Sequence, residues 1–305
     1  MKNTEELRKK YIRTRTSVLE FAKEYAYAYN PYTNLSGKIE LFDYQKHLLK
    51  NFDKNQFSII KQSRQVGVDL VVAIYIAYLL TKEQEQEILV ISDSGSSGEV
   101  FLQKVRNILI FEERDYYEEN EKIFEVDNKK ELQLKNNSRL RVVCPTGEAG
   151  RGCNIDLLFI NNFEYVPHIE EVWVAAGIAL TATKGKAIFT STPRYKKSFF
   201  HKFWTDATKK LNDFKPTNIN WKQNPYFDNE WYKKMCTILN NNNDAIAMEL
   251  DGKFIDKKDK KKKTAINLRM ELSKKEEILA RMKQKNISSI TDYIMELINR
   301  DLGKI

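Results

Sequence analysis

The feature that most constrains the fold is an alternation of short β-rich runs with helical stretches between residues 57 and 192. The β-rich runs are FSII (57–60), EILVIS (87–92), RLRVVC (139–144), DLLFIN (156–161) and KAIFTST (186–192). Strands joined through helices lie parallel, and a parallel sheet needs helices on both faces. The sequence therefore predicts an α/β fold with a mainly parallel sheet covered on both faces.

The stretch SIIKQSRQVGVDLVVAIYIAYLL, residues 58–80, joins a predicted strand to a predicted helix through a loop with one glycine, Gly67. A phosphate-binding loop has this form, because backbone N–H groups and a Lys neutralise the phosphates while a Ser or Thr hydroxyl holds magnesium. Here Val68 and Asp69 stand at those two positions. The Asp69 carboxylate is itself a favourable anion at a helix N-terminus and can take the place of a phosphate. A tight connection without any ligand produces the same pattern.

The run LLFINNFEYVP, residues 157–167, is typical of an apolar strand that ends in two polar residues. Nucleotide hydrolases place an Asp for magnesium and a Glu for the attacking water at this edge of the sheet. Here both positions are amides, Asn161 and Asn162. Asn161 carries no charge, and Asn162 cannot accept a proton as a base.

The charge of the chain is concentrated near its end. Lys and Arg number 51 against 42 Asp and Glu, a formal charge of +9, of which +6 lies in residues 256–305. This excess favours a polyanionic partner. Three scattered cysteines indicate a reducing compartment and no zinc site with paired ligands, and no apolar run resembles a signal peptide or a membrane span. We expect a cytoplasmic protein without a membrane partner or a bound metal.

Composition divides the chain into four parts. Residues 1–40 form a predicted helical segment, because apolar positions recur at helical spacing from Glu5 to Tyr29. Residues 41–255 form the α/β domain, and residues 256–263, DKKDKKKK, form a solvated basic linker without apolar side chains.

Residues 264–305 form a small module. The run TAINLRMEL alternates apolar and polar residues like a strand, and two amphipathic helices follow, the second with Ser289 as its N-cap. One strand and two short helices cannot bury this much apolar surface, so we predict a homodimer through residues 264–305.

The order of the motifs resembles the ATPase domain of phage large terminase subunits of the T4-like type, the motors that pump DNA into capsids. FDYQKHLLKNF resembles the adenine-side glutamine motif of that family, which assigns the role to Gln45. SRQVGVD resembles its Walker A loop, SRQ-x-G-K-[ST], with Arg64 as the loop arginine beside Gln65 and Gly67. The resemblance covers about residues 42–254 and implies a P-loop NTPase-like fold.

Three further segments follow in the order of that family. They are ISDSGSSGEVFLQKV, GEAGRGCNIDLLFINNFEYVP and AIFTSTPRYKKSFFHKFW. The last resembles the coupling motif that links hydrolysis to motion, which assigns that role to Thr190, Ser191 and Thr192.

The departures from this family fall on its charged groups. Val68 replaces the lysine, Asp69 the magnesium hydroxyl, and Asn161 and Asn162 the Walker B carboxylates. Because losing one such group costs several powers of ten in rate, we predict a pseudo-ATPase, with ATP and magnesium as cofactors only if the site functions. Lys61, at the start of the loop, is an alternative lysine, as in some packaging ATPases, but does not replace the carboxylates.

The C-terminal module resembles a ribbon-helix-helix module, as in the Arc and MetJ repressors. In that family strands from two chains form an antiparallel ribbon in the DNA major groove. The resemblance implies that Ala265, Asn267 and Arg269 face bases and that the Ser289 backbone faces a phosphate. A helical hairpin for protein association is the alternative. About fifty residues follow the ATPase-like part without an acidic cluster for two-metal cleavage, so we expect no nuclease domain.

These features favour a degenerate terminase-like protein that binds duplex DNA and regulates or participates in phage DNA packaging, with terminase or portal proteins as further partners. A second hypothesis is an active packaging ATPase subunit without a nuclease domain, which uses Lys61 with Glu164 or Asp156. A third is a ribbon-helix-helix repressor whose large domain is a scaffold.

Overall fold

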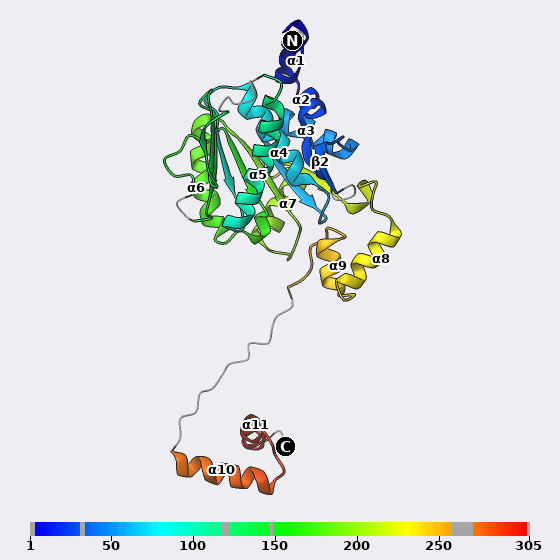
Figure 1. The fold of residues 1–305 in the computed structure, drawn as a ribbon. Coiled ribbons are helices and arrows are strands. Elements are labelled where there is room, and N and C mark those ends of the chain that lie inside the picture. Colours follow the sequence, from blue (N-terminus) through cyan, green and yellow to red (C-terminus); the bar gives the residue numbers. More distant parts are fainter. Residues whose placement is uncertain (1–3, 31–33, 117–122, 147–148, 258–270, 304–305) are drawn as a thin grey trace. The chain divides into compact units, whose positions relative to one another are not determined.

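The computed structural model describes residues 4–30, 34–116, 123–146, 149–257 and 271–303. The chain divides into two compact units, unit 1 (Met1–Lys257) and unit 2 (Lys258–Ile305). Figure 1 shows that the sheet of unit 1 lies between layers of helices. The figure also draws the helices of unit 2.

The core of unit 1 is an eight-stranded, mainly parallel sheet with the strand order β10-β3-β9-β8-β4-β7-β6-β5. All five predicted strands are present, as β3 (Phe57–Gln62), β4 (Glu87–Ile91), β7 (Arg139–Val143), β8 (Leu157–Asn161) and β9 (Lys186–Ser191). They pair in parallel, and β5 (Phe124–Asp127) and β6 (Glu131–Leu134) extend the sheet antiparallel beyond β7. The predicted α/β fold is confirmed.

The strand β10 (Lys215–Ile219) was not predicted from the sequence. Its sequence, KPTNI, contains Pro216 and shows no apolar alternation. It pairs in parallel with β3 at the edge of the sheet, a position where a proline is tolerated because one side of the strand needs no ladder bonds. Pairing with a neighbour, rather than local pattern, therefore makes this segment a strand.

Helices cover both faces of the sheet. The helices α2 (Val18–Tyr25), α3 (Asp43–Lys54), α4 (Val68–Lys82) and α5 (Gly95–Glu113) contribute to the core on one face, and α6 (Ile169–Thr183) and α7 (Phe199–Thr208) to that on the other. Alternate strand residues supply the two cores: Phe159 faces the first, and Leu158 and Ile160 face the second.

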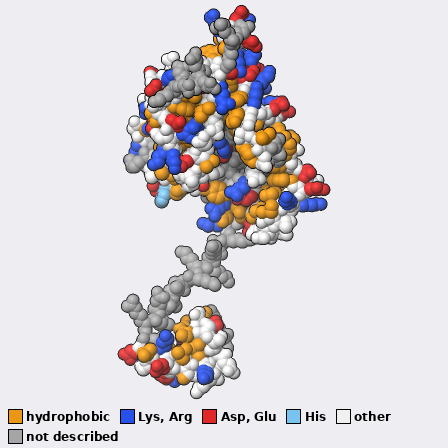
Figure 2. Space-filling model, viewed as in Figure 1, with side chains coloured by type: hydrophobic (Ala, Val, Ile, Leu, Met, Phe, Trp, Pro, Cys, Tyr) orange, Lys and Arg blue, Asp and Glu red, His pale blue; other side chains and the backbone are white. Residues whose placement is uncertain are grey.

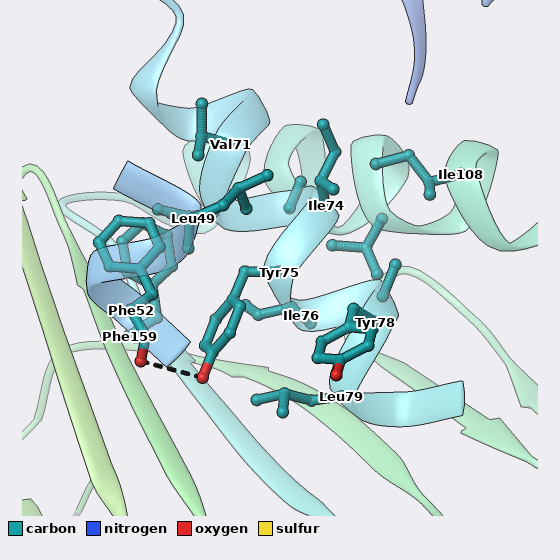
Figure 3. Close-up of a cluster of buried hydrophobic side chains, with 14 of the residues drawn as sticks. Leu49, Phe52, Val71, Ile74, Tyr75, Ile76, Tyr78, Leu79, Ile108 and Phe159 are labelled. Carbon is teal, nitrogen blue, oxygen red and sulfur yellow. Dashed lines mark hydrogen bonds between the residues drawn. The ribbon is translucent and has the colours of Figure 1, made fainter. Parts of the chain in front are cut away.

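The helix α4 is buried on all sides, as its nearly unbroken apolar sequence requires. Figure 3 shows Val71, Ile74 and Tyr75 of α4 packed among side chains of α3, α5 and β8. The Tyr75 hydroxyl donates a hydrogen bond of 3.1 Å to the carbonyl oxygen of Phe52, so this buried polar group is satisfied. The N-terminus of α4, where the phosphate-binding loop is predicted, is thus held by a rigid core.

The N-terminal segment differs from the single helical segment predicted for residues 1–40. The structure has α1 (Thr4–Thr16) and α2, separated at Ser17, whose side chain accepts a hydrogen bond from the Glu20 backbone and caps α2. Residues after Tyr25 form a hairpin of β1 (Tyr27–Asn30) and β2 (Leu35–Lys38), so the prediction of helix as far as Tyr29 is wrong. Tyrosine favours strands, and pairing with β2 decides the outcome.

The turn between α6 and β9 passes over the backbone that precedes β8. A Cβ at Gly185 would lie 2.3 Å from the carbonyl oxygen of Ile155 and 2.9 Å from that of Asp156. Because backbone atoms cannot rotate away, we expect Gly185→Ala to lower the free energy of unfolding by about 2 kcal/mol in chemical denaturation. The control is Gly95→Ala, at the start of α5 with no atom within 4 Å of the new Cβ. Equal effects of the two substitutions would contradict this packing argument.

The remaining part of unit 1 after β10 carries η2 (Trp221–Gln223), α8 (Asn229–Ile238) and α9 (Asn243–Glu249). They enclose a small separate core of Trp221, Phe227 and Leu250, with Trp231 stacked on Phe227 at 3.9 Å between ring centroids. The Trp221 and Trp231 side chains are thus packed in this small core.

Unit 2 contains α10 (Leu272–Gln284) and α11 (Ile290–Asp301), close to the two predicted helices. The predicted cap is confirmed, because the Ser289 hydroxyl accepts a hydrogen bond of 3.4 Å from the Asp292 backbone. The predicted strand lies outside the described residues except at its end, and there Leu272 begins α10, not the end of a strand. Ala265, Asn267, Arg269 and residues 258–263 of the predicted linker also lie outside the described residues.

Candidate functional site

The predicted phosphate-binding loop leads from the carboxyl end of β3 to the N-terminus of α4. Gly67 has φ +71°, a left-handed conformation that favours glycine, and a Cβ there would lie 2.8 Å from Nε2 of Gln45. The loop is tied to the end of unit 1, because the Ser63 hydroxyl donates to the Leu250 carbonyl and the Arg64 backbone N–H donates to the Glu249 carbonyl at 2.8 Å. The strand, loop and helix therefore have the geometry that the sequence predicted.

A cavity of about 460 Å³ lies at this loop. Among its lining residues are Gln62, Gly67, Asp69, Asp93, Lys104 and Asn162, which come from β3, the loop, α4, α5 and the segments after β4 and β8. The carboxyl ends of these parallel strands lie on the same side of the sheet, so the topology brings Asn162 to the loop, whereas Asn161 is buried and is not among the residues that line the cavity in the described structure.

The Asp69 side chain has a partner that the sequence did not reveal. Its Oδ2 lies 3.5 Å from Nζ of Lys104, which reaches it from α5. Both side chains are about one third exposed, so the pair is held at the mouth of the cavity rather than in the core. Val68, at the position of the lysine in the family motif, is 1% exposed and brings no charge.

Arg64, the second cation that lines the cavity, is also paired with a carboxylate. Its Nε lies 3.2 Å from Oε2 of Glu249, at the end of α9. Gln65 lines the same cavity in a left-handed conformation, with φ +61°. In the described structure each of the two cationic side chains lining the cavity therefore has a carboxylate partner.

The two amides at the end of β8 are held by hydrogen bonds to neighbouring strands. The Asn161 side chain is buried, and its Oδ1 accepts a hydrogen bond of 3.2 Å from the Thr190 hydroxyl. Asn162 has φ +55°, and its Nδ2 donates to Oδ1 of Asp93 at 3.0 Å. Asp93, which follows β4, is thus a carboxylate hydrogen-bonded to Asn162. The sequence did not identify Asp93 as a site residue, although it directly follows the predicted strand at 87–92.

The predicted coupling motif is connected to the segment that follows β8. Beyond the Thr190 bond, the Ser191 hydroxyl accepts a hydrogen bond of 3.1 Å from the Glu164 backbone N–H. The Thr192 and Tyr165 hydroxyls form a hydrogen bond of 3.2 Å. These side chains sit on β9 and directly after it, next to β8 in the sheet. These hydroxyl groups therefore join β9 to the end of β8 and to the segment that follows it, and the coupling role stays a prediction.

Gln45 lies beside the loop, in the first turn of α3. Its Oε1 accepts a hydrogen bond of 3.0 Å from the Phe42 backbone, and the side chain is buried. The neighbouring Tyr44 hydroxyl donates to the Val66 carbonyl at 2.7 Å. A second cavity of about 900 Å³, lined by Phe42, Gln45 and Tyr226 among others, shares Gly67 with the first. Gln45 is thus buried beside the loop, and its role at the base of a nucleotide stays a prediction.

Lys61, the alternative lysine, points to the opposite face of β3 from the cavity. Its Nζ lies 5.1 Å from the ring centroid of Trp204 and 5.7 Å from that of Phe254, and burial lowers its pKa. It is not among the residues that line the loop cavity in the described structure.

Neither of the two alternative acids is among the residues that line the loop cavity in the described structure. Asp156 precedes β8 and accepts a hydrogen bond of 2.9 Å from the Glu87 backbone, at the amino ends of the parallel strands, opposite to the loop. Glu164 accepts a hydrogen bond of 2.7 Å from the Ser198 hydroxyl, and burial raises its pKa more than this bond lowers it.

The described residues contain no group of three His, Cys, Asp or Glu side chains that could hold a metal ion. No described helix is long and apolar enough to cross a membrane.

A sequence model of the family described as terminase large subunit, T4likevirus-type, N-terminal, matches residues 59–271. The chain belongs to this terminase large-subunit family. The match spans more than half of the chain and includes the loop, the β8 amides and the coupling motif. The predicted family is thus confirmed, and the resemblance of residues 264–305 to a ribbon-helix-helix module stays a prediction.

Solved terminase structures share the fold. The large terminase ATPase domain of Thermus phage P74-26 has a TM-score of 0.56 and 16% identity, with 68% of this chain and 93% of that chain covered. The large terminase of bacteriophage HK97 has a TM-score of 0.61 and 13% identity, covering 79% and 55%. That of the thermophilic bacteriophage D6E in complex with ADP has 0.57 and 11%, covering 71% and 54%. The terminase chain described here therefore spans about half the length of the HK97 and D6E proteins.

Proposed function

We propose that this chain is a catalytically degenerate terminase large-subunit protein that binds duplex DNA and regulates or participates in phage DNA packaging. The observation that carries the proposal is the state of the loop cavity, where the two cations, Arg64 and Lys104, are each paired with a carboxylate. A nucleoside triphosphate would have to compete with Glu249 and Asp69 for them, and Asp93 adds a further negative charge to the cavity wall.

The loss of catalysis follows from the same positions. The family motif uses a lysine and a hydroxyl at residues now occupied by Val68 and Asp69, and two carboxylates where Asn161 and Asn162 stand. Without a magnesium ligand and a base, the developing charge on the transferred phosphoryl group is not stabilised and the attacking water is not oriented. The positions of Lys61 and Asp156 give no support to the alternative of an active ATPase subunit.

The architecture around the cavity is nevertheless retained. Gln45 lies beside the loop, Gly67 is the N-cap of α4, and the Thr190 hydroxyl contacts Asn161 at the end of β8. A protein that keeps this architecture but does not hydrolyse ATP can bind the partners of a packaging motor, including portal or terminase proteins, without driving DNA translocation.

Adding an excess of this protein to a packaging reaction driven by an intact T4-like large terminase from the same genome is expected to change the yield of packaged DNA. The measurement is the amount of DNA protected from nuclease inside capsids. A variant without residues 264–305 is the matched control, since it keeps unit 1 but lacks the predicted DNA-binding module. An unchanged yield with the full chain at a large excess would contradict the regulatory proposal.

We further propose that residues 264–305 make the protein a homodimer. The described helices of unit 2 bury little, with Met282 at 4% and Tyr293 at 5% exposure. Leu272 is 72%, Met295 48% and Leu297 43% exposed, a large apolar surface for so small a unit.

In sedimentation at tens of micromolar we expect a dimer of the full chain, because typical obligate dimers are saturated at this concentration. Leu297→Glu should shift the protein to the monomer, because it places a charge in the apolar interface. Arg300→Glu, an exposed position on the same helix, is the matched control and should leave the dimer intact. A monomeric full chain would show that the dimer prediction is wrong.

A further inference from the structure

Two segments far apart in sequence form one basic surface on unit 1. The segment directly after the coupling motif pairs with the last described residues of unit 1, since the Lys196 backbone donates to the Ile255 carbonyl at 2.8 Å and the Ile255 backbone to that of Arg194 at 3.0 Å. We call this surface the basic knuckle, and it consists of Arg194, Lys196, Lys197, Lys202, Lys253 and Lys257. All six side chains are exposed.

The positive charge of the basic knuckle is only partly compensated. Lys196 pairs with Asp256 at 2.8 Å, and Lys253 with Asp251 at 3.2 Å. In the described structure Lys197, Lys202 and Lys257 have no carboxylate within 4.0 Å. Glu164 also interacts electrostatically with Arg194, so six cations face three carboxylates and a surplus of positive charge remains on this surface.

An aromatic ring contacts two of the six cations of the basic knuckle. The Arg194 guanidinium lies 4.9 Å, and Nζ of Lys257 6.0 Å, from the centroid of the Tyr195 ring. The centroids of the Phe254 and His201 rings lie 4.7 Å apart, and burial together with the charge of Lys196 lowers the pKa of His201. Lys and Arg side chains are visible in Figure 2 on the part of unit 1 from which the chain leaves. Cations that are already ordered lose less entropy when they bind an anion.

We propose that the basic knuckle binds the phosphate backbone of duplex DNA. This inference rests on the proposed function and adds a DNA contact on the ATPase-like unit, separate from the C-terminal module. Its last residue, Lys257, begins the basic run that continues through Lys263 in the sequence, and such a run favours the same polyanionic partner. Exposed lysines without base-reading geometry contact phosphates and give sequence-independent binding.

The test is a titration of the full chain with a duplex of random sequence at several salt concentrations. The variant is Lys197→Gln with Lys202→Gln and Lys257→Gln, and the matched control is Lys50→Gln with Lys54→Gln and Lys130→Gln, three exposed lysines elsewhere on unit 1. Three lost phosphate contacts should reduce the slope of log K against log salt by roughly 2 to 3 and weaken binding about tenfold or more near 0.1 M salt. The control variant should change the slope of log K against log salt by less than about one.

The outcomes separate this inference from the proposed function. If the unmodified chain binds duplex DNA and the two triple variants behave alike, the basic knuckle is not a DNA contact while the DNA-binding function stands. If the unmodified chain does not bind duplex DNA at low salt, both are wrong. Equal melting temperatures of the two variants show that folding does not account for a difference.

Discussion

Purified protein will hydrolyse ATP no faster than buffer, with or without duplex DNA. The reason is that the magnesium-binding hydroxyl, the lysine and both Walker B carboxylates of the family motif are replaced, and such groups act as a unit whose loss costs several powers of ten in rate. The measurement is phosphate release, with an intact T4-like large terminase as the positive control. Robust hydrolysis that disappears on Lys61→Ala would falsify the pseudo-ATPase proposal.

Restoring the four groups should return nucleotide binding before turnover. Val68→Lys, Asp69→Thr, Asn161→Asp and Asn162→Glu together remove the Asp69 carboxylate from Lys104 and supply the missing ligands. Val68→Lys alone is the matched control, because Asp69 stays in place and still opposes the phosphates. We expect the fourfold variant to bind ADP at least tenfold more tightly than the single variant in calorimetry. Equal affinities would show that the Asp69–Lys104 pair does not limit binding.

Replacing Arg269 or Asn267 by Ala will lower the affinity for a preferred duplex by about 1 to 3 kcal/mol and flatten the sequence preference. The resemblance to a ribbon-helix-helix module places these side chains in a major groove, where an Arg or Asn makes bidentate bonds to a base. A selection from random duplexes, followed by titration at two salt concentrations, measures both effects.

The lysines at 260–263 are the control for this experiment. They can reach only phosphates, so neutralising them should weaken all duplexes alike and make the salt dependence shallower. If no sequence is enriched, or if Arg269→Ala acts as the lysine changes do, the module is a nonspecific tether or a protein-association hairpin.

The sheet could be predicted from local pattern because its central strands are long apolar runs that must be buried on both faces. Each of the five runs became a strand, and the loop with Gly67 took its expected place between β3 and α4. The pattern failed at β10 and at β1, short segments that become strands only through a neighbour. Neither segment has an apolar run like those of the predicted strands, since β10 is KPTNI and β1 is YAYN, so pairing with a neighbour decides their conformation.

By itself the sequence determined the fold class, the family and the absence of the usual charged groups at Val68, Asp69, Asn161 and Asn162, because each depends on residues within a short stretch. Only the tertiary structure decided which charges meet.

Lys104 reaches Asp69 from 35 residues away, and Glu249 pairs with Arg64 from another part of unit 1. The same holds for the basic knuckle, where Arg194 and Ile255 pair through the backbone. An exposed Lys on a helix has no local signal that identifies its partner, since the partner is set by how the elements pack.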